Sequence, residues 1–235
     1  MSNRGIFIVI EGTDGSGKKV QTDLLVSNLT ERGFDVVVFD FPTYGEPSAY
    51  FVEKYLRGEY QRRSDALNPK RASLFYALDR FEQAEKIQAA LSEGKVVVSN
   101  RYVASNMGHQ GAKFENTRER FLFFAWLDEL EYAILGIPRP DMNFVLHVSA
   151  DIAFDLIAKK GERRYLEGAS RDIHEKDIDH LRRAEMIYLQ MVQMFPEEFT
   201  LIECVENNKL CSQADIQELL SHKVSQLLRE KDLVF

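Results

Sequence analysis

The chain has 235 residues, of which 45% are hydrophobic, and a formal net charge of −7. This acidity argues against general nucleic-acid binding. No apolar run reaches the roughly 18 to 20 residues needed to span a bilayer. Cys204 and Cys211 are too few for a disulfide framework, and their spacing lacks partners for zinc. The first apolar run, a predicted strand, begins at residue 6, so we expect no signal peptide. We therefore expect a single cytoplasmic α/β domain over residues 1–235 that binds neither nucleic acid nor membrane.

The first predicted strand, 6–10, leads into a glycine-rich run and then into a helical pattern. The run consists of Gly12, Thr13, Asp14, Gly15, Ser16, Gly17, Lys18 and Lys19. Glycines let several backbone N–H groups point at one anion, and the helix that follows adds its positive end. Lys18 supplies a cation for the outer phosphates. An unliganded turn is the alternative, but the strand before the run and the helix after it favour a phosphate-binding loop.

Apolar runs alternate with helical patterns along the rest of the chain. Further strands are predicted at 36–39, 96–99, 143–148 and 200–203, and helices at 21–32, 70–92, 116–135, 151–159, 175–194 and 213–231. This alternation predicts a doubly wound, parallel five-stranded sheet with helices on both faces. Ligands of such sheets bind at the carboxyl ends of the strands, so the functional motifs should follow the first three strands.

Two aromatic motifs are candidates for a planar ligand. Phe41 and Pro42 follow the second strand, where the proline fixes a bend and the aromatic ring could form a wall. Tyr76 and Arg80 are four residues apart on one helix face, as stacking on a pyrimidine and donation to its carbonyl would require. The alternatives are a simple turn with Phe41 in the core, and a core aromatic beside a salt-bridged surface arginine.

Polar residues follow the third strand. Arg101, at the mouth of the sheet, is well placed for an acceptor phosphate, and the amides of Asn106 and Gln110 could read a base edge. His109 is interpreted as a wall residue, because phosphoryl transfer depends on positioning and charge more than on a strong base.

A basic, glycine-flanked segment lies between two predicted helices, at about 159–171. Its arginines, Arg163 and Arg164, would reach the transferring phosphoryl group if the segment were a short lid. A solvated basic loop is the alternative.

Together these segments resemble the thymidylate kinases, nucleoside monophosphate kinases that move a phosphoryl group from ATP to dTMP. The resemblance runs from residue 6 to about residue 203 and implies a P-loop NTP hydrolase-like fold, ATP with Mg²⁺, and a homodimer. It also implies ATP at the loop 12–19, with Lys18, Arg101 and a lid arginine as catalytic groups. The lid arginine is Arg163 or Arg164, because Gly15 stands where other members carry a loop arginine.

The resemblance also implies the residues that bind dTMP. Asp14 would contact the sugar 3′-hydroxyl, Tyr76 would stack on thymine and Arg80 would read the base. Arg101 matches the arginine of an Asp-Arg-Tyr motif in the family. The remaining implied contacts are Phe41, Pro42, Asn106, Gln110 and Tyr165.

Several residues depart from the family pattern. Lys19 replaces the Ser or Thr of the phosphate loop, and Asn100 replaces the Asp of the Asp-Arg-Tyr motif, so the usual metal positions hold no carboxylate or hydroxyl. Tyr44 replaces a phosphate-binding arginine and His109 an aromatic near the sugar. Three explanations are open. Lys19 could replace part of the charge of Mg²⁺, or the ion could be held by ATP and water with help from Glu11. Alternatively, the protein could bind nucleotide and barely turn over. A kinase for another pyrimidine monophosphate, such as dUMP, is a further alternative.

Overall fold

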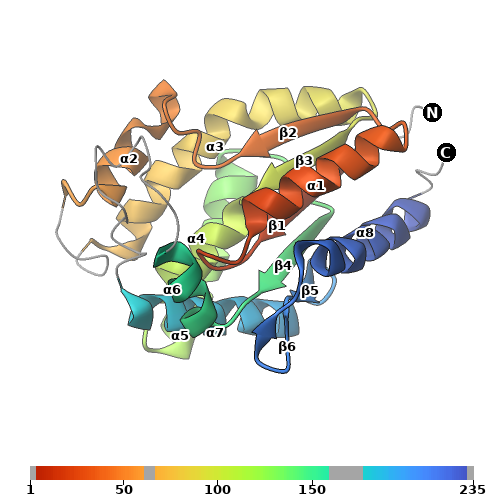
Figure 1. The fold of residues 1–235 in the computed structure, drawn as a ribbon. Coiled ribbons are helices and arrows are strands. Elements are labelled where there is room, and N and C mark those ends of the chain that lie inside the picture. The colour runs from red at the N-terminus through yellow and green to blue at the C-terminus, as the bar shows by residue number, and fades with distance from the viewer. Residues whose placement is uncertain (1–3, 61–66, 159–176, 232–235) are drawn as a thin grey trace.

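The computed structural model describes residues 4–60, 67–158 and 177–231, and it has the predicted doubly wound architecture (Figure 1). Five parallel strands form the central sheet in the order β2-β3-β1-β4-β5. They are β1 (Ile6–Glu11), β2 (Val36–Asp40), β3 (Val96–Asn100), β4 (Met142–His147) and β5 (Phe199–Glu203). The fold class predicted from the sequence is confirmed, with strand ends displaced by no more than a residue.

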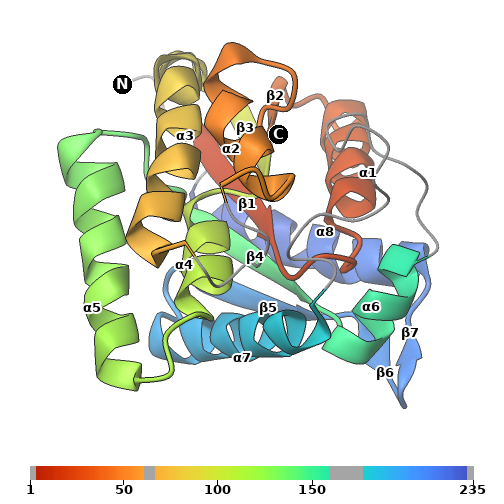
Figure 2. The same ribbon diagram turned by 90° about the vertical axis from the view of Figure 1, so that its left-hand side faces the viewer.

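The helices cover both faces of this sheet (Figure 2). Helices α1 and α8 lie together on one face, and α3, α4 and α7 lie on the other. The α-helices are α1 (Lys18–Glu31), α2 (Tyr50–Leu56), α3 (Pro69–Ser92), α4 (Val103–Gly111), α5 (Thr117–Asp128), α6 (Ala150–Ala158), α7 (Ile178–Met194) and α8 (Gln213–Glu230). Every residue of β1 is buried, because alternate side chains enter the two cores on either side of the sheet.

The structure adds short elements that the sequence patterns do not reveal. They are the 3₁₀-helix η1 (Pro47–Ala49), α2, α4 and the hairpin of β6 (Val205–Glu206) and β7 (Lys209–Leu210). The predicted helix 116–135 is divided, since α5 is followed by the π-helical segment η2 (Glu129–Ile134). None of the helices in the described ranges combines the length and the apolarity that crossing a bilayer would require.

The topology places the functional loops at one edge. The chain leaves β1 towards β2 and β3 on one side and later returns to β4 and β5 on the other. The carboxyl end of β1 is therefore the switch point of the sheet, where ligands of doubly wound folds bind. The loop 12–17 begins there and leads directly into α1.

Candidate active site

A cavity of about 820 Å³ opens at the carboxyl ends of β1, β2 and β3. The phosphate loop, the turn after β2, one face of α3 and the first turns of α4 form most of its walls, and residues of α6, β7 and the start of α8 complete them. Of the residues predicted from the sequence, it is lined by Asp14, Gly15, Ser16, Gly17, Lys18, Lys19, Phe41, Pro42, Tyr76, Arg80, Arg101, Asn106 and Gln110. Gly12 and Thr13 are not among the residues that line it. Arg163, Arg164 and Tyr165, with the whole of the predicted lid, lie outside the described residues.

The phosphate loop has the backbone that its glycines predict. Gly12, Gly15 and Gly17 adopt φ values of 136°, 85° and 85°, which L side chains rarely tolerate. At Gly15 a Cβ would lie 2.4 Å from the carbonyl oxygen of Ala153, so the chain could not follow this path with a larger residue. The Nζ of Lys18 folds back over the loop and donates to the carbonyl oxygen of Thr13 at 2.6 Å. The loop thus forms a cradle with a buried cation at its centre.

Lys19 has a different environment from Lys18. Its side chain is 62% exposed and its Nζ lies 2.5 Å from Oδ1 of Asp23, one turn further along α1. A protonated ammonium cannot ligate a metal, and this one is held at the surface of the first helical turn by a carboxylate.

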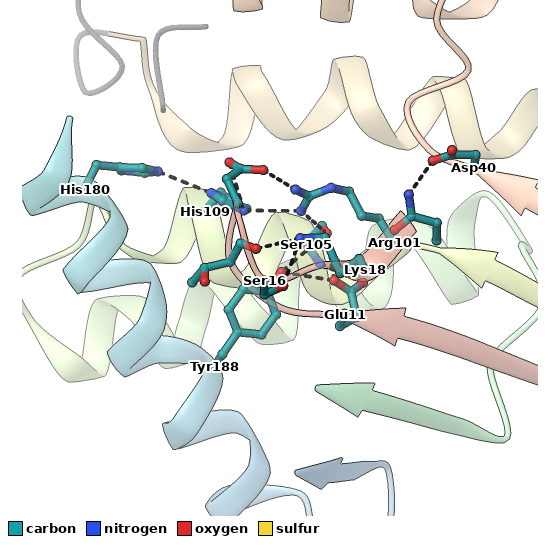
Figure 3. A network of polar contacts seen from close by, with 12 residues as sticks. Glu11, Ser16, Lys18, Asp40, Arg101, Ser105, His109, His180 and Tyr188 are labelled. Atoms are coloured by element: carbon teal, nitrogen blue, oxygen red, sulfur yellow. Dashed lines mark hydrogen bonds and ion pairs between the residues drawn. The ribbon is translucent and has the colours of Figure 1, made fainter. Parts of the chain in front are cut away.

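Arg101 enters the cavity from a turn in the left-handed region. Its φ is 68°, and its peptide N–H donates to the carbonyl oxygen of Ile10 at 3.0 Å. The hydroxyl of Ser99 donates to the carbonyl oxygen of Arg101 at 2.7 Å, which also supports the turn. The guanidinium forms an ion pair with Asp14 and donates to the hydroxyl of Ser105 at 3.1 Å (Figure 3). The loop after β1 and the turn after β3 are therefore joined at the centre of the site.

Glu11 anchors this arrangement from below. Its side chain is fully buried, and Oε1 accepts from the peptide N–H groups of Tyr102 and Ser105 at 2.7 and 3.1 Å. Oε2 accepts from the hydroxyls of Ser105 and Tyr188 at 2.7 and 3.0 Å. Burial raises the pKa of Glu11, while the nearby charge of Arg101 opposes this. With both oxygens occupied, Glu11 orients α4 instead of offering a ligand to Mg²⁺, which removes the support for its suggested role at the metal.

His109 lies between Arg101 and a second histidine. Its Nε2 is 3.4 Å from Nη1 of Arg101, and its Nδ1 is 3.4 Å from Nε2 of His180 (Figure 3). Burial, aided by the charge of Arg101, lowers the pKa of His109 to about 3. The ring is thus neutral near pH 7 and too weak a base to take a proton there, as expected of a wall residue.

Tyr76 and Arg80 both face the cavity, but Arg80 is not a surface residue. Its side chain is 2% exposed, and its Nε donates to Oε2 of the fully buried Glu131 at 2.7 Å, with a second, shorter bond between Nη2 and Oε1. A guanidinium has five N–H donors, so two or more remain for a ligand beside this pair. The amide of Asn106 donates to Oε1 of Glu131 at 3.3 Å. Arg80 is therefore a buried arginine that Glu131 holds in one orientation at the cavity wall.

Gln110 contributes an acceptor on the same side. Its Oε1 atom is buried and accepts no hydrogen bond from the described part of the chain. A buried carbonyl oxygen without a donor costs about 1–3 kcal/mol. A ligand N–H group would remove this penalty.

Asp79 and Glu131 hold parts of the cavity wall in place, and the sequence patterns miss both. Asp79 accepts from the peptide N–H of Thr43 at 2.9 Å and from the hydroxyl of Ser48 at 2.7 Å, which ties the turn after β2 to α3. The adjacency of Asp79 and Arg80 was visible in the sequence, but nothing in it indicated that their partners lie 36 and 51 residues away.

Comparison with known proteins decides the family. A family model described as thymidylate kinase matches residues 10–216. The chain belongs to the thymidylate kinase family. The thymidylate kinase of Mycobacterium tuberculosis is 32% identical over 188 residues, which cover 79% of this chain and 85% of that protein. A protein of Pyrococcus horikoshii, named as a probable thymidylate kinase, is 32% identical over 83% of this chain and 86% of its own length.

A solved structure supports the fold independently. The thymidylate kinase from Candida albicans superposes with a TM-score of 0.69 over 98% of this chain and 93% of its own, at 18% identity. At that identity the likeness establishes the fold alone. Membership of the family follows from the sequence relatives and makes this chain an ATP-dependent phosphotransferase.

Proposed function

We propose that this chain transfers the γ-phosphoryl group of ATP to dTMP, giving ADP and dTDP for dTTP synthesis. The observation that carries this function is the single cavity shared by the phosphate loop, Arg101 and the pair of Tyr76 and Arg80. A donor nucleotide on the loop and an acceptor on α3 would meet at Arg101, where their phosphates would be in line. Relatives with the same family name support dTMP as the acceptor.

The transfer needs charge and position from the protein, and no side-chain nucleophile. A phosphate oxygen of dTMP forms the new bond to the γ-phosphorus of ATP, and the bond from that phosphorus to the β–γ bridging oxygen breaks. Lys18 and Arg101 stabilise the charge that spreads over the transferred group, and Arg163 or Arg164 would add a further cation. Because the attacking oxygen is already anionic, the neutral His109 has no proton to accept.

The acceptor base would lie against Tyr76. An N–H group of thymine suits the unpartnered Oε1 of Gln110, and a thymine carbonyl suits the remaining donors of Arg80. Asp14 and Asn106 complete the proposed substrate contacts, with Phe41 and Pro42 forming the wall after β2. Uracil carries the same hydrogen-bonding groups, so dUMP is the acceptor to compare first.

The decisive assay measures ADP formation from ATP with dTMP, dUMP, dCMP, dGMP or AMP, in Mg²⁺ and in EDTA. We expect selective turnover with dTMP that depends on Mg²⁺. Replacing Lys18→Met should lower kcat/KM by roughly 10²- to 10³-fold. The matched control is Lys95→Met, at the opposite end of β3, where the lysine pairs with Asp35 and Glu93. Binding of both nucleotides without turnover would contradict the proposal and leave a nucleotide-binding homologue.

We also propose that the chain forms a homodimer in the cytoplasm. Leu74, Leu78 and Phe81 lie four and three residues apart on α3 and are each exposed by 39% or more. Phe121 and Leu122 of α5 are slightly more exposed, and Figure 2 shows α3 and α5 on the same side. The two cysteines are free, as is usual in a reducing compartment. This apolar face supports self-association.

Light scattering after gel filtration tests the dimer. The wild-type chain should elute at twice its 27.1 kDa mass. Leu78→Glu should shift it to the monomer, whereas Glu82→Gln, an exposed change one turn further along α3, should not. A monomeric wild type would contradict the proposal.

A further inference from the structure

Asp40 and Asn100 form a polar pair at the mouth of the cavity. They are register partners at the carboxyl ends of the adjacent strands β2 and β3. The Nδ2 of Asn100 donates to Oδ1 of Asp40 at 2.7 Å. Both residues line the same cavity as the phosphate loop, and Figure 3 shows Asp40 near Arg101, at the opposite end of the polar network from His180.

The pair leaves oxygen atoms without partners. Asn100 is 8% exposed, and its buried Oδ1 accepts no hydrogen bond from the described residues. Asp40 is exposed, and among the described residues only the amide of Asn100 donates to it. A buried carbonyl oxygen without a donor indicates a missing partner. Carboxylate and amide oxygens are the ligands that Mg²⁺ prefers, so these residues fit the ion.

Electrostatics point to a cation at the same place. A carboxylate that faces a cavity built for two phosphorylated ligands would repel them unless a positive charge lay between. The charges of Lys19 and Arg101 both act on Asp40, but each cation already has a carboxylate partner, Asp23 for Lys19 and Asp14 for Arg101. Both oxygens of Glu11 are occupied. Within the described ranges no cluster of three or more His, Cys, Asp or Glu side chains offers an alternative metal site. A metal ion that enters with ATP needs few protein ligands, because Mg²⁺ keeps several waters and phosphate oxygens.

We propose that Asp40, oriented by Asn100, is the carboxylate that holds the Mg²⁺ of Mg·ATP in this chain. The inference rests on the proposed kinase function, in which that ion neutralises charge on the outer phosphates. It also accounts for the amide at position 100. Two carboxylates at paired positions would repel each other, whereas an amide donates to its neighbour and orients it. The metal-binding carboxylate thus stands at the end of β2 in this chain, where the family motif would place it at the end of β3. Asn100 is its positioning residue.

The test measures the binding of the non-hydrolysable β,γ-imido analogue of ATP by calorimetry, in Mg²⁺ and in EDTA. The dissociation constant in EDTA, divided by that in Mg²⁺, gives the contribution of the metal to binding. Asp40→Asn should lower this ratio by about 10-fold or more. In EDTA the variant should bind the analogue as tightly as the wild type or more tightly, because a repulsive charge has gone. Asp35→Asn, the matched change just before β2, should leave the ratio unchanged.

The exchange of the two residues gives a second, independent readout. The double variant Asp40→Asn, Asn100→Asp keeps one carboxylate and one amide, and it should restore the ratio to within about 3-fold of wild type, since each ligand change alone costs 10-fold or more. Equal weakening by Asp40→Asn in Mg²⁺ and EDTA would show that Asp40 only shapes the cavity, and would overturn the inference. A ratio for Asp40→Asn equal to that of the wild type would also overturn it. Wild-type turnover with dTMP is scored separately, so a failure of the kinase function is distinguishable from a failure at Asp40.

Discussion

The buried pair of Arg80 and Glu131 offers the sharpest test of how the acceptor side is built. Glu131→Gln keeps the shape of the side chain but removes its charge, and the new amide N–H₂ would face the N–H donors of the guanidinium. Both side chains are almost fully buried, so water can reach little of the arginine that is left. Burial lowers the pKa of Arg80 and the charge of Glu131 raises it, with a net rise in the wild type. The variant loses the contribution of Glu131, but a guanidinium is not deprotonated in a protein, so Arg80 stays charged.

The expected cost follows from this burial. Removing one partner of a buried ion pair costs about 3–5 kcal/mol, because an uncompensated charge stays in the interior. For a chain of this length each kcal/mol shifts Tm by about 3 °C, so Glu131→Gln should lower Tm by roughly 9–15 °C. Replacing both partners, Arg80→Met with Glu131→Leu, should recover much of this loss while weakening dTMP binding, since the donors to the base are gone.

Urea and thermal unfolding of the three chains measure these effects. Glu129→Gln is the matched control, because Glu129 is an exposed acid two residues away in η2 and should cost less than about 0.5 kcal/mol. A loss below about 1 kcal/mol for Glu131→Gln would refute the reasoning, because the pair would then have to be solvated or dispensable. Full recovery of dTMP affinity in the double replacement would refute the role of Arg80 at the base.

Two further predictions concern the pH dependence of stability and the phosphate loop. Burial lowers the pKa of His109 to about 3 and that of His180 to about 4, so below about pH 6.5 the unfolded chain binds protons that the folded chain does not. The free energy of unfolding should therefore fall as pH drops from 7 to 4, less steeply in His180→Gln, which urea titrations at several pH values would show; parallel profiles would contradict this. Gly15→Ala should destabilise the chain and weaken ATP-analogue binding far more than Gly17→Ala, because a Cβ at Gly17 meets nothing within 4 Å. Left-handed φ alone should cost Gly17→Ala about 1–2 kcal/mol, and equal losses in urea midpoints would contradict the packing argument.

The central sheet was predictable because its signals are local. Parallel strands covered on both faces must be apolar throughout, and the five runs stand out for that reason. Helix α4 was missed because it is short and contains Gly108 and Gly111. Those glycines lie where a Cβ would be 2.6 Å from the ring of Tyr188 and 2.8 Å from that of Phe124. Glycine is needed at these positions because α4 packs closely against α7 and α5, and no local sequence pattern indicates that packing.

The candidate site divides in the same way. The phosphate loop and the spacing of Tyr76 and Arg80 could be identified from neighbouring residues, because backbone conformation and helix periodicity depend on them. The burial of Arg80 against Glu131 could not be identified in this way, nor could the four hydrogen bonds that occupy both oxygens of Glu11, because the partners are distant in sequence.

The sequence by itself determined the order of the elements, the phosphate cradle, the family resemblance and the departures at Lys19 and Asn100. Only the tertiary structure showed that Asp40 lies beside Asn100 in register, 60 residues away along the chain. Local motifs are written in consecutive residues because they shape one stretch of backbone. Charged residues that interact must be close in space, but neighbouring strands of a parallel sheet are separated along the chain by a long crossover connection. Their pairing therefore cannot be identified from consecutive residues.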